Sequence, residues 1–245
     1  MSHPSSPLLK TPPPSALRVG GLVPFTATDY PDALAAVVFC QGCPWRCGYC
    51  HNPHLIPMRR KHLHDWPTIS EWLKTRRGLL DAVVFSGGEP MAQPTLQEAV
   101  TATRAQGFRI GLHTGGAYPR RLKALLPHLD WIGLDLKASP AGYARVTGVV
   151  GSELSAFEAL PLIQRAGVPF EVRTTVHGAL TPPEELWALA AILNERGVTR
   201  WVLQPFRAQG CDNEALLARA GEAVVLDEAL LQTLRGFVPQ IDVRR

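Results

Sequence analysis

Three cysteines, Cys43, Cys47 and Cys50, lie within one eight-residue stretch of the chain. Three residues separate the first pair, two separate the second, and a short apolar run at residues 34–39 precedes them. A strand that ends in such a loop can present three thiolates to one metal centre. Four thiolates would close a structural zinc site or an electron-transfer cluster. Three leave one coordination position open to a substrate, so the spacing indicates a catalytic metal centre.

A fourth cysteine, Cys40, keeps a second interpretation open. Together the four read C-x2-C-x3-C-x2-C, which could form a closed site such as a zinc knuckle or a ferredoxin-like cluster. Against this, Cys40 falls at the end of an apolar strand, where a free cysteine is commonly a small buried hydrophobe. Cys211 lies far along the chain in a polar segment, and we assign it no role.

The cysteine loop also resembles that of a known family. With Tyr49 directly before the last cysteine, its CxxxCxxC spacing is similar to the cluster loop of radical S-adenosylmethionine (SAM) enzymes. Further segments resemble the activating protein of the anaerobic (class III) ribonucleoside-triphosphate reductase, from residue 18 to residue 210. The family pattern uses only the later three cysteines and tends toward Asn where Gly115 stands here. The segments that carry the resemblance are Gly20-Gly21-Leu22, Asp29-Tyr30-Pro31, Gln41-Gly42-Cys43, Ser86-Gly87-Gly88-Glu89-Pro90, Gly111-Leu112-His113-Thr114, Leu134-Asp135-Leu136-Lys137 and Arg173-Thr174-Thr175-Val176.

This resemblance implies one [4Fe–4S] cluster per chain, held by Cys43, Cys47 and Cys50, with SAM chelating the open iron. It implies reductive cleavage of SAM to a 5′-deoxyadenosyl radical that generates a glycyl radical on the large reductase subunit. The implied partners are that glycyl-radical subunit and a one-electron donor such as flavodoxin or ferredoxin. His51 is expected to orient the loop. The residues that the resemblance places near SAM are Tyr49 at the adenine, Gly87, Gly88, Glu89 and Pro90 at the ammonium group, and Asp135 and Lys137; we add His113 as a candidate without an acid–base role.

The Gly-Gly-Glu-Pro run has a physical rationale of its own. Two glycines without Cβ atoms let the backbone approach a ligand closely, and Glu89 supplies a carboxylate beside them. The alternative is an ordinary strand-to-helix turn with a proline at the helix start.

Charged side chains on two predicted strands indicate a polar lumen. Side chains alternate along a strand, so Asp135 and Lys137 share one face of the segment at 131–136. A fully buried parallel strand is usually apolar on both faces, although this pair could also be a simple ion pair at a strand end. The strand at 170–176 alternates in the same way, with Glu171, Arg173 and Thr175 on one face.

Apolar runs alternate with helical patterns along the chain, which predicts a parallel sheet with helices outside it. The predicted strands are 34–39, 82–85, 109–113, 131–136, 170–176 and 200–204. The predicted helices are 69–77, 95–106, 120–126, 152–166, 183–196 and 227–236, with Pro161 expected to kink or interrupt the fourth. This count suits an open α/β sheet or a barrel, and the resemblance implies a partial (β/α)6 TIM-like barrel of the radical SAM type. In parallel barrels the chemistry lies on the loops after the strands, where the candidate residues fall.

Length and composition predict one domain over residues 18–245, preceded by a Ser/Pro-rich extension at 1–17 that we expect to be disordered. The net charge of +4 is too small to indicate a nucleic-acid partner. No run reaches the ~18 apolar residues of a membrane helix, and the N-terminal residues do not read as a signal peptide. We therefore expect a cytoplasmic protein without a membrane partner. In that compartment clustered cysteines indicate metal binding or catalysis rather than disulfides.

Two other functions stay open. A different small radical SAM enzyme, making a deazapurine or modifying a peptide, would share every cluster and SAM feature. A non-catalytic metal module would instead need Cys40 as a fourth ligand. The chemistry implied by the resemblance requires no side-chain acid or base, which agrees with the lack of a convincing His–carboxylate pair in the sequence.

Overall fold

The computed structural model describes residues 16–59, 64–219, 221, 224 and 226–244. The extension predicted at residues 1–17 therefore lies outside the described residues, except for Ala16 and Leu17. Leu17 is buried in the hydrophobic core.

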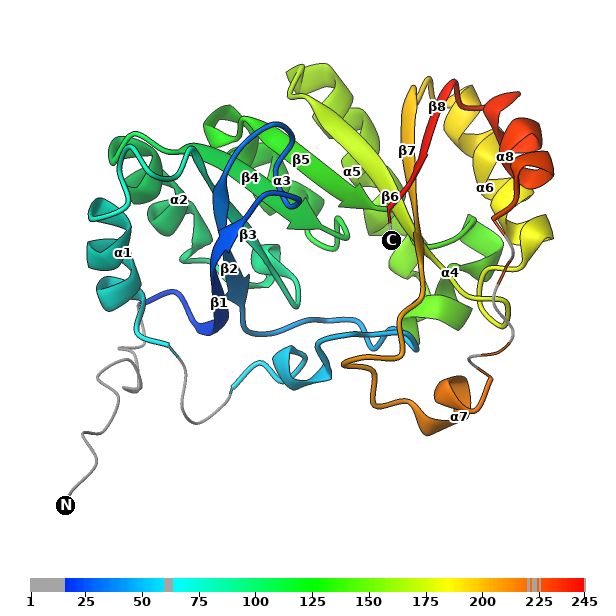
Figure 1. Cartoon of the computed structure of the whole chain (residues 1–245), viewed down its shortest axis with the longest axis horizontal. Coiled ribbons are helices and arrows are strands. Elements are labelled where there is room, and N and C mark those ends of the chain that lie inside the picture. The colour runs from blue at the N-terminus through cyan, green and yellow to red at the C-terminus, as the bar shows by residue number, and fades with distance from the viewer. Residues whose placement is uncertain (1–15, 60–63, 220, 222–223, 225, 245) are drawn as a thin grey trace.

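One eight-stranded sheet, with its strands in chain order, runs through the protein, and helices cover its outer side (Figure 1). The six predicted strands are present as the parallel strands β2–β7. Two strands were not predicted: β1, antiparallel to β2, and β8, parallel to β7. The strands are β1 Val19–Thr26, β2 Ala35–Cys40, β3 Ala82–Gly87, β4 Arg109–Thr114, β5 Trp131–Asp135, β6 Phe170–Val176, β7 Arg200–Pro205 and β8 Gln240–Val243.

The helices follow the predicted alternation, with two additions, α4 and α7. The expected interruption at Pro161 is wrong, because α5 runs through it as one helix. Its neighbours Leu160 and Ile163 are fully buried, and this packing offsets the backbone hydrogen bond that proline removes. The helices are α1 Trp66–Lys74, α2 Leu96–Ala105, α3 Pro119–Leu125, α4 Pro140–Thr147, α5 Ser152–Ala166, α6 Pro183–Glu195, α7 Glu214–Leu217 and α8 Glu228–Arg235, with short 3-10 turns η1 Pro53–Leu55, η2 Pro90–Ala92 and η3 Leu126–His128.

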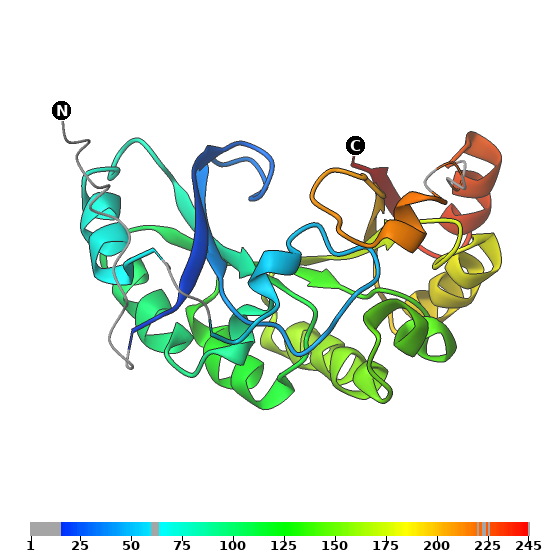
Figure 2. The ribbon, with the colours of Figure 1, turned by 90° about the horizontal axis from the view of Figure 1, so that it is seen from below.

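The sheet curves into a partial barrel with one open side. Figure 2 shows a trough with helices along its convex face, and the β1–β2 hairpin and the C-terminal strand facing each other across the opening. A large hydrophobic core lies between sheet and helices. A smaller cluster, which includes Val37, Val84, Tyr30 and Trp131, fills one end of the lumen. A cavity occupies the other end, at the carboxyl ends of the strands.

Within the described residues, no single helix is long and apolar enough to cross a membrane. Helices α4 and α5 together have the length and apolar composition of a membrane span, but a bend of 116° separates the two helices.

Candidate active site

A cavity of about 500 Å³ lies inside the barrel at the carboxyl ends of the strands. Along the inner face of the sheet, the side chains change from apolar to polar toward this end. On β3 the apolar Val84 is followed by Ser86, and on β5 the apolar Trp131 is followed by Asp135. The structure brings together in this cavity nearly all of the residues singled out from the sequence. They are Cys43, Cys47, Tyr49, Cys50, Gly87, Gly88, Glu89, His113, Asp135 and Lys137. Pro90 does not line it; this residue is buried at the start of η2.

Backbone hydrogen bonds fix the cysteine loop in place. Gly42 and Cys43 donate N–H bonds of 2.7 Å and 3.0 Å to the carbonyls of Leu55 and Ile56. Further along, Arg46 and Gly48 donate to the carbonyls of Thr147 and Val146 at 2.8 Å and 3.0 Å, which ties the loop to the end of α4. All five cysteines are free thiols, so this geometry does not depend on a disulfide.

The three loop cysteines are not grouped as ligands of one metal ion in the part of the chain that the structure describes. Among the described residues, no three His, Cys, Asp or Glu side chains lie close enough to share one ion, as a zinc knuckle requires. In a four-iron cluster each thiolate binds a different iron, so wider spacing is needed. Cys40 is fully buried in β2 and does not line the cavity. The position of Cys40 favours the three-ligand interpretation over a closed four-cysteine site, and the ligand set stays a prediction.

Burial keeps these thiols protonated until a metal arrives. It raises the pKa of Cys43 to about 12, and it raises the pKa values of Cys47 and Cys50 as well. Metals bind the thiolate, so cluster assembly must displace these protons.

Gly87, the last residue of β3, and Gly88 after it are required by close packing against the end of β2 and the start of the cysteine loop. Gly87 has a φ of +121°, and a Cβ there would lie 2.3 Å from the backbone nitrogen of Cys40. A Cβ on Gly88 would lie 2.5 Å from the carbonyl oxygen of Gly42. The sequence argument for glycine at these positions was close approach to a ligand, whereas here the close approach is between two segments of backbone.

Glu89 is held as a brace between the ends of β3 and β4. Its side chain is 1% exposed. Its Oε1 accepts from the Met91 N–H at 3.0 Å and from the Thr114 hydroxyl at 2.7 Å, and its Oε2 accepts from the Gly115 N–H at 2.9 Å. Burial raises the pKa of this carboxyl, and these hydrogen bonds oppose the rise.

Asp135 pairs mainly with Arg173 rather than with Lys137. The Arg173 Nε and Nη2 atoms both lie 2.8 Å from Asp135 Oδ1, because Asp135 and Arg173 are register partners on β5 and β6. The Lys137 Nζ atom is 3.7 Å from Oδ2. Burial alone would raise the pKa of Asp135, but Arg173 and then Lys137 outweigh it and lower the pKa.

Lys137 is a nearly buried cation facing the cysteines. Its Nζ lies 5.8 Å from the ring centroids of both Trp45 and Tyr49. Burial would lower its pKa, but the surrounding groups, the Asp135 carboxylate among them, raise it well above the ordinary lysine value. The side chain therefore carries a positive charge, only partly balanced by Asp135, into the cavity.

The two candidate histidines have different surroundings. Burial lowers the pKa of His113 well below its usual value, and its Nε2 lies 3.0 Å from the Asp29 carbonyl oxygen, so the neutral ring braces the β1–β2 loop. His51 stacks on Phe206, with ring centroids 5.7 Å apart. Its buried Nε2 has no hydrogen-bond partner among the described residues.

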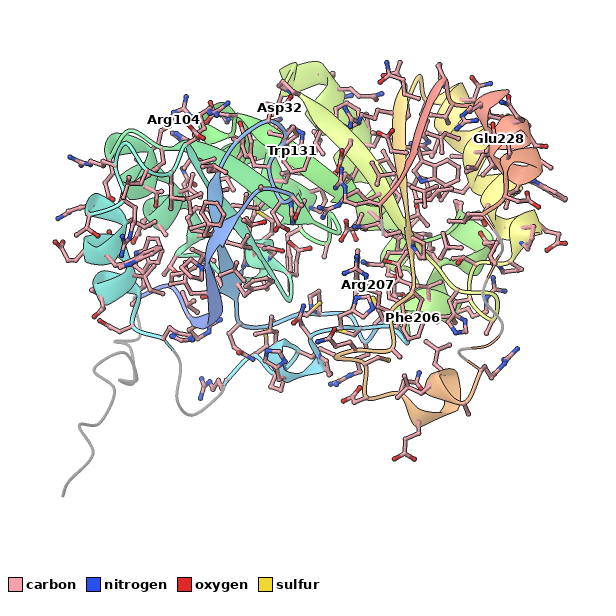
Figure 3. The ribbon with its side chains drawn as sticks, viewed as in Figure 1. Asp32, Arg104, Trp131, Phe206, Arg207 and Glu228 are labelled. Atoms are coloured by element: carbon pink, nitrogen blue, oxygen red, sulfur yellow. The ribbon has the colours of Figure 1, made fainter. Side chains whose placement is uncertain are left out.

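Several cavity residues were not identified from the sequence. Trp45 fills the space beside Gly115, where a Cβ would lie 2.2 Å from the indole Cζ3. Arg207 follows Phe206 where the chain after β7 approaches the cysteine loop (Figure 3). Arg244, near the C-terminus, reaches the lumen and donates two bonds to buried Glu171, at 2.9 Å and 3.2 Å. Of these residues, only Trp45 could have been found from the sequence, because it lies inside the cysteine loop. Nothing in the local sequence marks Arg207 or Arg244 as part of the site.

Comparison with known proteins identifies the family of this site. Residues 37–195 match the family model described as the Radical SAM superfamily. The chain belongs to the radical SAM superfamily. Its cofactors are therefore a [4Fe–4S] cluster and SAM, and the chemistry of the three-thiol loop fits that cluster.

Named relatives include activating enzymes and a peptide-modifying enzyme. The chain is 32% identical over 187 residues to the pyruvate formate-lyase-activating enzyme of Clostridium pasteurianum, covering 72% of this chain and 77% of that one. It is 31% identical over 123 residues to MJ1227 of Methanocaldococcus jannaschii, named as a candidate glycyl-radical enzyme activating enzyme, covering 49% and 50%. It is 34% identical over 143 residues to the PqqA peptide cyclase of Gluconobacter oxydans, covering 55% and 39%. The matches thus span half of MJ1227 and less than half of the cyclase.

Solved structures share the fold at low sequence identity. QueE from Escherichia coli aligns with a TM-score of 0.58 and 15% identity over 93% of each chain. Streptococcus suis SuiB bound to S-adenosylmethionine aligns with a TM-score of 0.60 and 13% identity, over 84% of this chain and 48% of that one. These likenesses confirm the partial-barrel fold predicted from the sequence.

Proposed function

We propose that this protein is a glycyl-radical enzyme activating enzyme and that its partner is the large subunit of anaerobic ribonucleoside-triphosphate reductase. The observation that carries the proposal is one cavity that combines three cysteines with a buried cation and is lined by residues that follow both end strands of the sheet, Asp29 after β1 and Arg244 after β8. Such a cavity can hold SAM and still admit a segment of another protein through its open side. The similarity to the Clostridium pasteurianum activating enzyme over 72% of this chain supports the same function.

We assign the roles of individual residues from their positions in the cavity. Cys43, Cys47 and Cys50 would hold the cluster, whose chemistry when bound is to pass one electron to SAM so that the C5′–S bond breaks and methionine leaves. Lys137 supplies a positive charge opposite the cysteines, which suits the SAM carboxylate. Tyr49 lies beside it and offers a ring face to the adenine.

Other residues position these groups. The backbone of Gly87 and Gly88 lines the cavity and offers carbonyl oxygens to the SAM ammonium group. The Glu89 carboxylate already accepts three protein hydrogen bonds, and we assign it to holding that backbone in place. His113 is neutral and bonded to the Asp29 backbone, which agrees with a reaction that needs no side-chain acid or base.

The product of the chemistry is 5′-deoxyadenosine, formed when a hydrogen atom moves from the glycine α-carbon of the partner, which keeps the unpaired electron. A one-electron donor such as flavodoxin or ferredoxin would supply the electron. The free thiols require a reducing compartment, and we propose the cytoplasm.

The test is anaerobic mixing of the reconstituted protein with the purified large reductase subunit, SAM and dithionite, followed by electron paramagnetic resonance. We expect a glycyl radical signal on the large subunit, and no signal with Cys47→Ala. Active cleavage of SAM without any glycyl radical would refute this partner. It would favour the peptide-modifying alternative, which the similarity to PqqA peptide cyclase also supports.

A further inference from the structure

The chain after β7 crosses the cysteine loop and packs closely against it. Phe206, labelled in Figure 3, stacks on the His51 ring with centroids 5.7 Å apart. Gly210 has a φ of +85°, and a Cβ there would clash with the carbonyl oxygen of His51. Both the conformation and the space therefore favour glycine at this position. We call residues 206–213 the clamp segment.

One carbonyl group of the cysteine loop lies against two donors of the clamp segment. The Asn213 Nδ2 atom donates to the Gly48 oxygen at 3.0 Å, and the Cys211 Sγ atom lies 3.7 Å from the same oxygen. The amide is the stronger donor, because a thiol donates only weakly. Asn213 is itself held in place, since its Oδ1 accepts from the Leu216 N–H at 3.2 Å at the start of α7. The Gly48 carbonyl is therefore directed toward the clamp segment.

This carbonyl belongs to the central peptide of a turn that begins at Cys47 and ends at Cys50. The Cys50 N–H donates to the Cys47 carbonyl at 3.0 Å, which closes the turn around Gly48 and Tyr49. Gly48 has no side chain to restrict the peptide between these two residues, so the orientation of that peptide depends on the bonds that its carbonyl makes.

The same peptide runs from one side of the cysteine loop to the other. Gly48 lines an outer hollow together with Asn213, whereas Tyr49 lines the cavity. The peptide is trans, so its carbonyl and its N–H point in opposite directions. Since the Gly48 carbonyl points to Asn213, the Tyr49 N–H points toward the cavity, which Cys47 and Cys50 also line.

Backbone N–H groups already reach the sulfur atoms of this loop. The Trp45 N–H donates to the Cys43 sulfur, and the Asn52 N–H donates to the Cys50 sulfur. In an iron–sulfur cluster, hydrogen bonds to the sulfurs are one of the factors that set the reduction potential. They raise it, because they stabilise the additional negative charge of the reduced form. The Tyr49 N–H is placed to add one more such bond.

We propose that Asn213 is a positioning residue for the cluster: by holding the Gly48 carbonyl, it directs the Tyr49 N–H toward cluster sulfur and so raises the reduction potential. The clamp segment thereby makes the cluster easier to reduce by a one-electron donor. This inference goes beyond the proposed function, because it concerns reduction of the cluster and does not depend on which molecule accepts the radical.

The experiment exchanges the residue types at positions 212 and 213. The double variant Asp212→Asn/Asn213→Asp keeps the net charge of the clamp segment and an oxygen that can cap α7, but it loses the amide donor to Gly48. Asp212→Asn alone is the matched control, because it removes the charge of Asp212 and keeps the donor.

Both variants and wild type are reconstituted anaerobically and held at one ambient potential, and the ratio of reduced to oxidised cluster is measured by electron paramagnetic resonance. In the double variant this ratio should fall about tenfold, which corresponds to a potential about 59 mV lower for a one-electron couple. In Asp212→Asn it should not fall. A ratio equal to wild type in the double variant at equal iron content, or an equal fall in the control, would overturn the proposal.

A second measurement uses wild-type protein and does not require any variant to fold. The chain contains four tyrosines, and Tyr49 is the one in the cysteine loop. After labelling of tyrosine with ¹⁵N, pulsed electron paramagnetic resonance of the reduced cluster should show coupling to ¹⁵N. A reduced cluster without this coupling would overturn the proposal. Normal cluster reduction with ¹⁵N coupling but no glycyl radical on the large reductase subunit would refute the proposed partner and leave the role of Asn213 standing.

Discussion

Glu89→Gln tests whether this carboxylate is a structural brace or a free ligand for SAM. In the structure it accepts three hydrogen bonds, at 3.0 Å, 2.7 Å and 2.9 Å, and all three donors belong to buried residues. Glutamine can keep its oxygen toward Met91 and Thr114, but its NH2 group then faces the N–H of Gly115. One charge-assisted bond is lost, and a buried donor is left without a partner, which together cost about 2–4 kcal/mol.

This cost is measurable in protein that lacks cluster and SAM. For a domain of this size, ~1 kcal/mol lowers Tm by about 2–4 °C, so Glu89→Gln should unfold roughly 4–16 °C below wild type in a thermal melt. Thr114→Val removes one donor to the same carboxylate, and the double variant should be less destabilised than the sum of the two single variants. A Tm within about 2 °C of wild type, combined with loss of SAM binding, would refute the brace and make Glu89 a direct ligand.

Three further predictions concern the cavity wall. Gly115→Asn should lower Tm, because the new Cβ would lie 2.2 Å from the Trp45 ring. Adding Trp45→Ala should recover part of this loss in Tm. A Tm equal to wild type for Gly115→Asn alone would contradict this contact. Burial lowers the pKa of His113 below that of the unfolded chain, so its contribution to stability is complete above pH ~6.5 and declines as the pH falls, by up to about 1.4 kcal/mol per pH unit. Urea melts from pH 7.5 to 5 should show this decline in wild type, and His113→Gln should reduce it. Lys137→Met should weaken SAM binding to reconstituted protein by about 10- to 100-fold in anaerobic calorimetry, since a charge-assisted contact is lost; an unchanged Kd would remove Lys137 from the site.

Most of the fold followed from buried runs of β-branched and apolar residues, which marked β2–β7 to within about two residues. β1 escaped prediction because two glycines and a proline give it the composition of a loop. β8 has only four residues, and α4 only eight. Pro161 was expected to kink or interrupt α5, and the helix is not interrupted there, because the buried residues around it outweigh the local preference.

The candidate site was predictable in outline, because chain order alone places the loops after parallel strands at one end of a barrel. The partners of its charged groups were not. That Asp135 pairs with Arg173 depends on the register between β5 and β6, and that Glu89 bonds to Thr114 and Gly115 depends on how closely two strand ends pack. The local sequence around Asp135 or Glu89 specifies neither set of contacts.

The measurement that tests the account most directly is production of 5′-deoxyadenosine by protein reconstituted anaerobically with iron and sulfide and then supplied with dithionite and SAM. We expect product from wild type and from Cys40→Ala, and none from Cys47→Ala, because we assign the cluster to the three loop thiolates, whereas Cys40 is buried in the sheet. Loss of bound iron and product in Cys40→Ala, or a fully loaded wild-type cluster that forms no product, would contradict the three-cysteine site on which every proposal above depends.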